Sequence, residues 1–571
     1  MYTDMETRND KRWKYGLVML LVACHIVVGA FAAPAKIEWR TYVQPDGTVL
    51  TLTLYGDEHF SCYRDMAGRF YSRDSLGVFS LMTPNQLRRE ATATLQTRGS
   101  SDGYLTYPHT FWDKDRVYRQ LVVLVSFADC DFKSEDPSAT YNAMFNESGY
   151  NELNGPGCMA DYFRDQSGGL FNMQFDVYGP VKVSGNAQSS SRPRKDYSKD
   201  TFREAMQILI ADHPDIDYSP YDWNEDGSVD QVIFIYAGLS GNQAASIGYI
   251  WPNTSYFSTI QTPDGHKISH YSASAERWTA TLTCGIGTIC HEFSHCLGLP
   301  DIYPTSTSVD ALSIVDEWDL MDGGITTNTG WCPPNYSPLE KMLMGWLTPE
   351  ELTENTNISG LKPIADGGKA YRIRHTDQEY YLLENRQRQG WDFGLPGHGL
   401  LVYHVKYDQA LWEDNKVNNI NGKPYYSLVA ADNLDYNDWN EIFAKSGKAS
   451  RYVNSPMLNK IHLSTAPYPW RTDSTTFVNQ ELSATSTPAA QMYDADEEGN
   501  LMLGKSITNI TEHEDGTISF RFLVDGQEDD IHTPRTATTK GGAIYTLQGV
   551  RVAAPTKGGI YIRDGHKVVV K

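Results

Sequence analysis

The feature that most constrains this chain is residues 290–301, which read CHEFSHCLGLPD. His291 and His295 are four residues apart, so on a helix their side chains stand on the same face, one turn above each other. From that face both imidazoles can reach one zinc ion, while Glu292 points to the water on the metal. Apolar residues recur at helical spacing through this stretch, which predicts a helix with a face to bury.

The end of the stretch makes the zinc interpretation more specific. Gly298 stands where the helix must stop and can take a left-handed conformation at low cost, and Pro300 prevents the helix from restarting. The reversed chain can then bring the Asp301 carboxylate back as a third ligand, which leaves the fourth position open for water. The alternative is a core helix whose two histidines are hydrogen-bonded and bind no metal.

This pattern, HExxHxxGxxD, resembles the zinc site of the metzincin peptidases, most closely the immune inhibitor A type, whose third ligand is an aspartate. Metzincins also carry a methionine turn beneath the metal, and residues 318–324, WDLMDGG, look like that turn, with Met321 as its methionine. Taken alone, that segment could be an ordinary loop after a strand. The resemblance implies an α+β metzincin-like catalytic domain, with a mixed twisted sheet plus the zinc helix.

The expected chemistry is peptide-bond hydrolysis in protein or peptide substrates. Zinc on three protein ligands keeps one open position and brings the pKa of its bound water near ~7. Glu292 is expected to take the proton of that water as general base and to pass it to the leaving amine. Tyr303 and Tyr336 are candidates for a tyrosine that stabilises the oxyanion. The chain is therefore predicted to be a zinc-dependent endopeptidase.

Two interpretations from other functional classes compete with this one. The chain could be a catalytically inactive surface protein that binds a glycan or a protein and carries a structural zinc, but the intact Glu292 argues against it. It could also be a structural surface lipoprotein in which zinc only stabilises the fold. Structural zinc sites usually have four protein ligands that include cysteine, whereas here three ligands and a glutamate favour hydrolysis.

The net charge of the chain indicates which classes of partner it can bind. Lys and Arg number 49 against 71 Asp and Glu, which gives a formal net charge of −22. A surface this acidic repels nucleic acid, so no nucleic-acid partner is expected. The same surface suits hard cations such as calcium.

One acidic segment, residues 222–230, reads DWNEDGSVD and has the spacing of the first part of an EF-hand calcium loop. Asp222, Asn224, Asp226 and Asp230 occupy positions 1, 3, 5 and 9, with glycine at position 6. The twelfth position is Ile233 instead of glutamate, and the residues that follow read as a strand. A calcium site and a polar turn held by Asx hydrogen bonds therefore both stay open.

The N-terminus predicts export. Lys11, Arg12 and Lys14 precede an apolar run at 15–31, which is short for a membrane helix and ends in small residues. We interpret residues 1–32 as a signal peptide with cleavage near Ala32. Cys24 stands in a sequence that resembles a lipoprotein box, although apolar residues continue beyond it. The protein is expected to be secreted or at the cell surface, with lipidation at Cys24 left open.

The sequence pattern divides the rest of the chain into further predicted segments. Residues 33–110 read as a β-rich segment, which in the resembling family is the propeptide, and the connector at 86–101 looks exposed to processing. Cys62 could inhibit the zinc of such a precursor or could simply be a core residue. The catalytic domain is expected at 111–350. Residues 351–524 are β-rich and sandwich-like, and the lone His404 there is interpreted as a packed polar residue.

The C-terminal segments complete the predicted organisation. Residues 525–542 are polar and read as a linker. Residues 543–571 contain short strands and resemble C-terminal sorting tails, which address proteins to secretion machinery at the outer membrane. A hairpin that packs on the preceding sandwich is the alternative.

Overall fold

The computed structural model divides the chain into two compact units, Met1–Leu523 and Val524–Lys571. The residues it describes are 31–32, 35, 39–56, 61–74, 76–83, 86–87, 112–188, 194–242, 248–306, 309, 311–445, 461–471, 478–526, 544–546, 551–552, 560–563 and 566–569. Three predictions fall wholly or largely outside them: the signal peptide with Cys24, the connector beyond residue 87 and the linker from 527.

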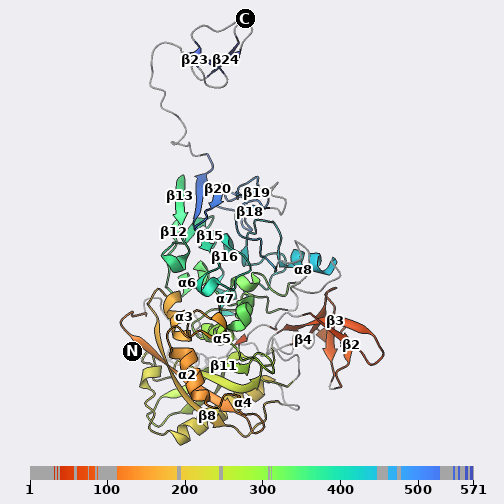
Figure 1. Ribbon diagram of the computed structural model, residues 1–571, viewed down its shortest axis with the longest axis vertical. Coiled ribbons are helices and arrows are strands. Elements are labelled where there is room, and N and C mark those ends of the chain that lie inside the picture. The colour runs from red at the N-terminus through yellow and green to blue at the C-terminus, as the bar shows by residue number, and fades with distance from the viewer. Residues whose placement is uncertain are drawn as a thin grey trace, which may run out of the picture. The chain divides into compact units, whose positions relative to one another are not determined.

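The larger unit is built on a six-stranded mixed sheet with the order β1-β10-β11-β9-β7-β8. Figure 1 labels two of its strands, β8 and β11. Its strands are β1 (Phe31–Ala32), β7 (Val117–Ser126), β8 (Asn172–Lys182), β9 (Val232–Leu239), β10 (Asn253–Gln261) and β11 (Lys267–Arg277). β8, β7, β9 and β11 run parallel to one another. β10 is antiparallel to β11, and β1, at the end of the predicted signal peptide, is antiparallel to β10.

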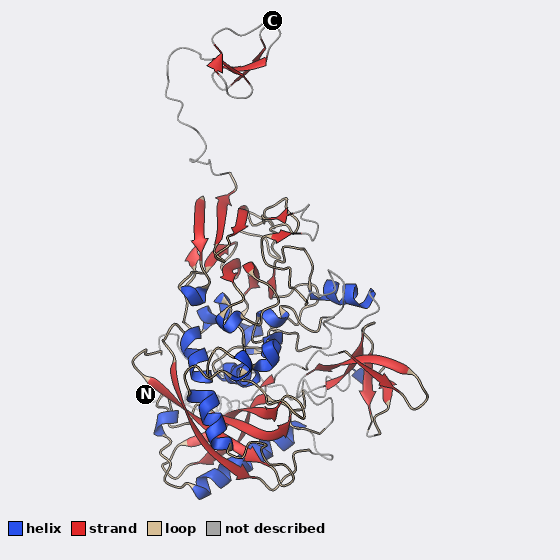
Figure 2. Cartoon of the chain, in the orientation of Figure 1, coloured by secondary structure: helices blue, strands red, loops and turns tan. Residues whose placement is uncertain are grey.

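Strand β7 is buried on both faces, as its continuous apolar run predicts. Val122 and Leu124 belong to the hydrophobic core on one side of the sheet, and Leu121 and Val123 to the core on the other side. This division follows from the alternation of side chains along a strand. Helices cover both sides of the sheet (Figure 2). They are α2 (Pro137–Asn146), α3 (Met159–Gln166), α4 (Arg194–Asp212) and α5 (Gly287–Cys296).

The segment predicted as a propeptide forms an antiparallel sheet in sequence order, β2-β3-β4-β5-β6. Its strands are β2 (Arg40–Val43), β3 (Val49–Gly56), β4 (Ser61–Asp65), β5 (Phe70–Arg73) and β6 (Phe79–Leu81). Tyr55 and Cys62 pack in one cluster with Leu312 and Tyr436, and the Tyr55 hydroxyl donates to the carbonyl of Ser306 at 3.3 Å. Cys62 thus lies in this apolar cluster and is not part of the metal-ligating group described below.

Beyond residue 350 the chain is mainly strands. They form a five-stranded sheet, β12-β14-β15-β16-β17, a three-stranded sheet, β13-β21-β20, and the pair β18-β19. The strands are β12 (Glu350–Glu351), β13 (Thr356–Leu361), β14 (Tyr371–Arg374), β15 (Glu379–Arg386), β16 (Gly399–Lys406), β17 (Tyr426–Leu428), β18 (Trp470–Arg471), β19 (Val478–Asn479), β20 (Lys505–Glu512) and β21 (Ile518–Val524). The sandwich-like arrangement stays a prediction.

Three further helices and short 3-10 turns belong to the larger unit. The helices are α6 (Pro338–Leu343), α7 (Gln409–Glu413) and α8 (Tyr436–Lys445). The 3-10 turns are η1 (Glu152–Asn154), η2 (Ser219–Tyr221), η3 (Asp316–Trp318), η4 (Gly323–Gly330), η5 (Ile364–Asp366) and η6 (Gly390–Asp392). One hydrophobic core joins Trp318 and Met321 to Leu382 and Tyr403, so apolar packing continues across residue 350.

The smaller unit holds a four-stranded antiparallel sheet in the order β23-β22-β24-β25. Its strands are β22 (Ile544–Thr546), β23 (Arg551–Val552), β24 (Ile560–Arg563) and β25 (His566–Val569). In the described parts of the chain, no helix has both the length and the apolar composition to cross a membrane.

Candidate metal centre

Helix α5 is buried along its whole length and ends at the predicted glycine. The N–H of Gly298 bonds the carbonyl of His295, and Gly298 has a φ of 103°, which glycine adopts at little cost. At the other end, a Cβ on Gly287 would lie 2.8 Å from the carbonyl oxygen of Ile325, so glycine allows the helix to approach η4 closely. The helix that carries the histidines is therefore fixed at both ends.

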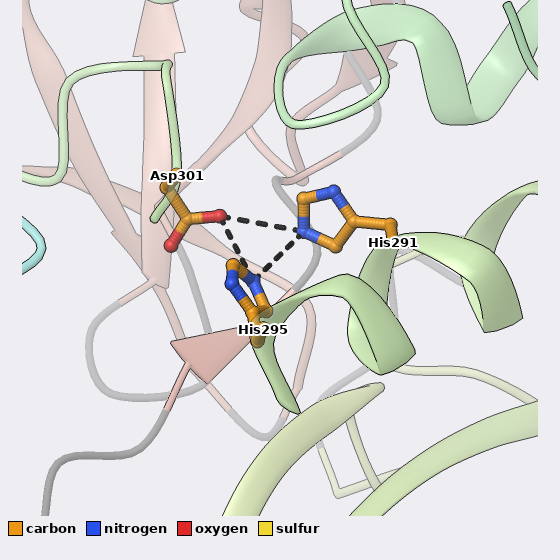
Figure 3. A group of neighbouring side chains, drawn as sticks. All are labelled: His291, His295 and Asp301. Atoms are coloured by element: carbon orange, nitrogen blue, oxygen red, sulfur yellow. Dashed lines mark hydrogen bonds and ion pairs between the residues drawn. The ribbon is translucent and has the colours of Figure 1, made fainter. Parts of the chain in front are cut away.

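The structure brings His291, His295 and Asp301 together around one point (Figure 3). The two Nε2 atoms are 3.2 Å apart, and each lies 3.3 Å from Oδ1 of Asp301. Ligand atoms at 2.0–2.2 Å from a tetrahedral zinc are separated by roughly 3.3–3.5 Å. Two nitrogens and one carboxylate oxygen at this spacing fit a zinc ion, whereas calcium prefers oxygen ligands alone.

The other ring nitrogens fix the orientation of the two imidazoles. Nδ1 of His291 lies 2.9 Å from the carbonyl oxygen of Leu320, and Nδ1 of His295 lies 2.7 Å from that of Leu299. A carbonyl oxygen only accepts, so each Nδ1 carries the hydrogen and each neutral ring presents the Nε2 lone pair to the centre. Oδ1 of Asp301 is also buried and lacks a hydrogen-bond partner among the described residues. Three electron-pair donors thus face one another, which suits a cation between them.

Burial and neighbouring charges shift the pKa values of these groups toward the protonation states that bind a metal. Burial lowers the pKa of His295, which favours the neutral imidazole. Burial alone would raise the pKa of Asp301, but attraction to the two neighbouring imidazoles in their protonated form outweighs it and holds that pKa well below its usual range. Metal ligands must be deprotonated, so both shifts favour binding of a cation.

Glu292 lies beside this centre with its carboxylate held by a residue that the sequence did not reveal. The hydroxyl of Thr254, on strand β10, lies 3.1 Å from Oε2 of Glu292 and 2.6 Å from its main-chain oxygen. Both residues are 0% exposed. No local pattern marks Thr254, because its contact with Glu292 spans 38 residues and depends on how α5 packs against the sheet.

The predicted methionine turn lies next to the centre. Met321 is buried, its N–H donates to Oδ1 of Asp319 at 2.8 Å, and its carbonyl accepts from Ile302 at 2.8 Å. Its neighbour Leu320 supplies the carbonyl that orients His291. The turn is therefore bonded both to a predicted zinc ligand and to the residue that follows Asp301.

The acidic loop forms a hydrogen-bonded turn. Asp222 accepts the N–H groups of Asp226 and Gly227 at 3.1 and 2.8 Å, and the N–H of Trp223 donates to Asp230. Burial raises the pKa of Asp230 to about 7. Asn224 also accepts the N–H of Asp226, at 3.1 Å. Among the described residues, only the His-His-Asp group gathers three ligand atoms of His, Cys, Asp or Glu within 4.8 Å.

Three other side chains named in the sequence analysis have local roles in the structure. The Tyr336 hydroxyl is hydrogen-bonded to the Ser294 hydroxyl on α5, and Tyr303 is buried. His404 pairs its Nε2 with Glu379 at 2.7 Å and is buried among tyrosines, which agrees with a packed polar residue.

Comparison with known proteins gives the family of this site. Residues 112–344 match the model described as immune inhibitor A peptidase M6, catalytic domain. Immune inhibitor A of Bacillus thuringiensis subsp. alesti is 25% identical over 276 residues, which cover 40% of this chain and 39% of that protein. The pre-pro-metalloprotease PrtV of Vibrio cholerae serotype O1 is 22% identical over 288 residues, or 44% of this chain and 30% of that protein.

These matches span less than half the length of either curated relative. The region matched by the family model contains α5, Asp301 and the methionine turn, so the family assignment and the geometry concern the same residues. Residues 112–344 are thus similar to the catalytic domain of the immune inhibitor A peptidases, peptidase M6.

Proposed function

We propose that this protein is a secreted, zinc-dependent endopeptidase. The observation that carries the proposal is the convergence of Nε2 of His291, Nε2 of His295 and Oδ1 of Asp301 at tetrahedral spacing, with Glu292 beside them. Zinc held there would acidify a water molecule and polarise the carbonyl of the scissile peptide. The substrates would be proteins or peptides, in line with the peptidase family of the matched domain.

In the proposed mechanism Glu292 is the general base. Its carboxylate takes a proton from the attacking water and then gives that proton to the nitrogen of the leaving amine. Thr254 holds Oε2 of Glu292 from β10 while this happens. The carbonyl groups of Leu320 and Leu299 keep both imidazoles in the tautomer that offers Nε2 to the metal.

The proposal extends to processing and export. The N-terminal sheet packs on Leu312, which follows the zinc loop in sequence, and on Tyr436 at the start of α8, and would be a propeptide that is removed on activation. The relative PrtV is described as a pre-pro-metalloprotease, which supports a signal peptide and propeptide here. The C-terminal unit would address the protein to secretion machinery at the outer membrane. Calcium in the loop at 222–230 remains a secondary proposal.

The competing function is a catalytically inactive binding protein with a structural zinc. The matched domain belongs to a peptidase family, and the chain keeps both its metal-ligating group and Glu292. We therefore favour catalysis.

The test is casein cleavage by the activated wild type and by Glu292→Ala, with and without a chelator. The variant keeps every zinc ligand but lacks the base, so it should retain zinc and lose roughly 10²–10⁴-fold in rate. The chelator should abolish the wild-type activity. Equal cleavage by wild type and variant would contradict the proposed function.

A further inference from the structure

The third ligand, Asp301, is held by a residue far outside the region that matches the family model. Asn415 donates from Nδ2 to Oδ2 of Asp301 at 2.6 Å, and its Oδ1 accepts the main-chain N–H of Asp301 at 2.7 Å. Both bonds join residues 114 positions apart in the chain. A single side chain therefore binds the carboxylate and the backbone of the ligand together.

The end of helix α7 places Asn415 for this contact. The N–H of Lys416 bonds the carbonyl of Leu411 at 2.8 Å, and the N–H of Asn415 bonds that of Trp412 at 3.2 Å. These two bonds are those of a Schellman ending, whose left-handed residue is usually glycine and sometimes asparagine. Asn415 has a φ of 55°, so it adopts the conformation that the ending needs and adds an amide that glycine lacks.

The amide leaves the carboxylate with one atom for the metal. Oδ2 of Asp301 is occupied by the Asn415 donor, whereas Oδ1 faces the two Nε2 atoms and lacks a hydrogen-bond partner among the described residues. If Asp301 rotated about its side chain, it would lose the bond to Asn415. The contact thus selects which oxygen points to the histidines.

We propose that Asn415 is a positioning residue for the zinc centre, which orients Asp301 so that Oδ1 completes the ligand set. The inference rests on the proposed zinc function. It means that the centre is completed by residues beyond 344, where the family match ends. Loss of an outer hydrogen-bond partner of a metal ligand typically costs roughly 10–100-fold in metal affinity.

A second asparagine on the same segment offers a matched control. Asn419 accepts the main-chain N–H of Thr305 at 2.8 Å and donates to the Thr305 hydroxyl at 2.9 Å. These bonds also span 114 residues and tie the same two segments together. Asn419 thus makes the same pair of hydrogen bonds as Asn415, but its partner Thr305 is not a proposed zinc ligand.

The experiment compares Asn415→Gly and Asn419→Ala in the full chain. Glycine keeps the left-handed end of α7 and removes only the amide side chain. Zinc affinity is measured by competition with a chromogenic chelator, and the visible spectrum of Co²⁺-loaded protein reports ligand geometry. Asn415→Gly should bind zinc roughly 10–100-fold more weakly and change the Co²⁺ spectrum. Asn419→Ala should match the wild type in both measurements.

Three outcomes would contradict the positioning role of Asn415 or the proposed zinc-dependent function on which it rests. Unchanged affinity and spectrum in Asn415→Gly would show that Asp301 needs no such partner. Equal changes in both variants would show that general attachment of the loop, and not the contact with the ligand, is responsible. A wild type that binds no stoichiometric zinc would instead contradict the proposed function itself. The unfolding midpoints of the metal-free proteins show whether either variant has lost its fold.

Discussion

The contact between Thr254 and Glu292 predicts a measurable catalytic role for a threonine on strand β10. The Thr254 hydroxyl has one hydrogen and two acceptors within reach, the Glu292 main-chain oxygen at 2.6 Å and Oε2 at 3.1 Å. Both residues are fully buried in this structure, so loss of the hydroxyl would remove a donor that the fold holds in place. Thr254→Val keeps the shape of the side chain and removes this donor.

The size of the effect follows from the kind of hydrogen bond that is lost. A hydrogen bond to a charged group contributes about 1.5–3 kcal/mol. Each 1.36 kcal/mol corresponds to a tenfold change in rate, so kcat should fall roughly 10- to 150-fold if the bond orients the base in the transition state. Zinc content should stay at the wild-type level, because Thr254 contacts none of the three ligands in the described structure.

The assay is kcat and KM on a quenched fluorescent peptide, with metal content measured on the same samples. Thr254→Ser restores the hydroxyl and should recover most of kcat. Ser255→Ala is the control from the same strand, since the Ser255 hydroxyl is buried without a hydrogen-bond partner in the described structure. A Thr254→Val enzyme with wild-type kcat would refute the reasoning. A loss of activity that follows a loss of zinc would refute it as well.

Two further predictions concern the acidic loop and the N-terminus. Calcium at a hundredfold excess over its dissociation constant should stabilise the zinc-loaded protein by roughly 2.7 kcal/mol, because it would offset three aspartates within nine residues. Thermal unfolding should show this stabilisation in the wild type and not in the Asp222→Ala/Asp226→Ala variant. An unfolding midpoint that does not change with calcium would mean that the loop is only a polar turn. N-terminal sequencing of active, secreted protein should begin well beyond Ala33, whereas an intact start at Ala33 on fully active enzyme would contradict a precursor.

The parts of the site that could be predicted from the sequence are those set by local chain geometry. Two histidines one turn apart share a helix face wherever that helix packs, and Gly298 fixes the direction of the chain toward Asp301. The strand β7 was predictable for a similar reason, because a continuous apolar run is stable only when both faces are covered. In each case the relevant residues lie within about a dozen positions of one another.

The supporting residues could not be predicted, because their roles arise only from tertiary packing. Thr254 is an ordinary residue for a strand and Asn415 for a helix end, and nothing nearby in the sequence indicates their partners. The polar residues of β15 show the same limit. Glu384 and Arg386 are charged residues two positions apart in a strand. Both are nevertheless buried, and Arg386 binds Asp392 at 2.5 and 2.7 Å and Glu384 at 3.2 Å.

The predicted boundary at residue 350 does not separate the candidate metal centre from the β-rich segment. Asn418 donates to the carbonyl of Ile302 at 2.8 Å and exchanges hydrogen bonds with the main chain of Tyr426. The Tyr426 hydroxyl in turn donates to Asp319 at 3.1 Å, in the turn that also contains Met321. These buried bonds tie the ligand loop and the methionine turn to one short segment after α7. A catalytic domain cut at 350 would lose these bonds together with Asn415, so we infer that the zinc centre and the β-rich segment fold as one cooperative unit.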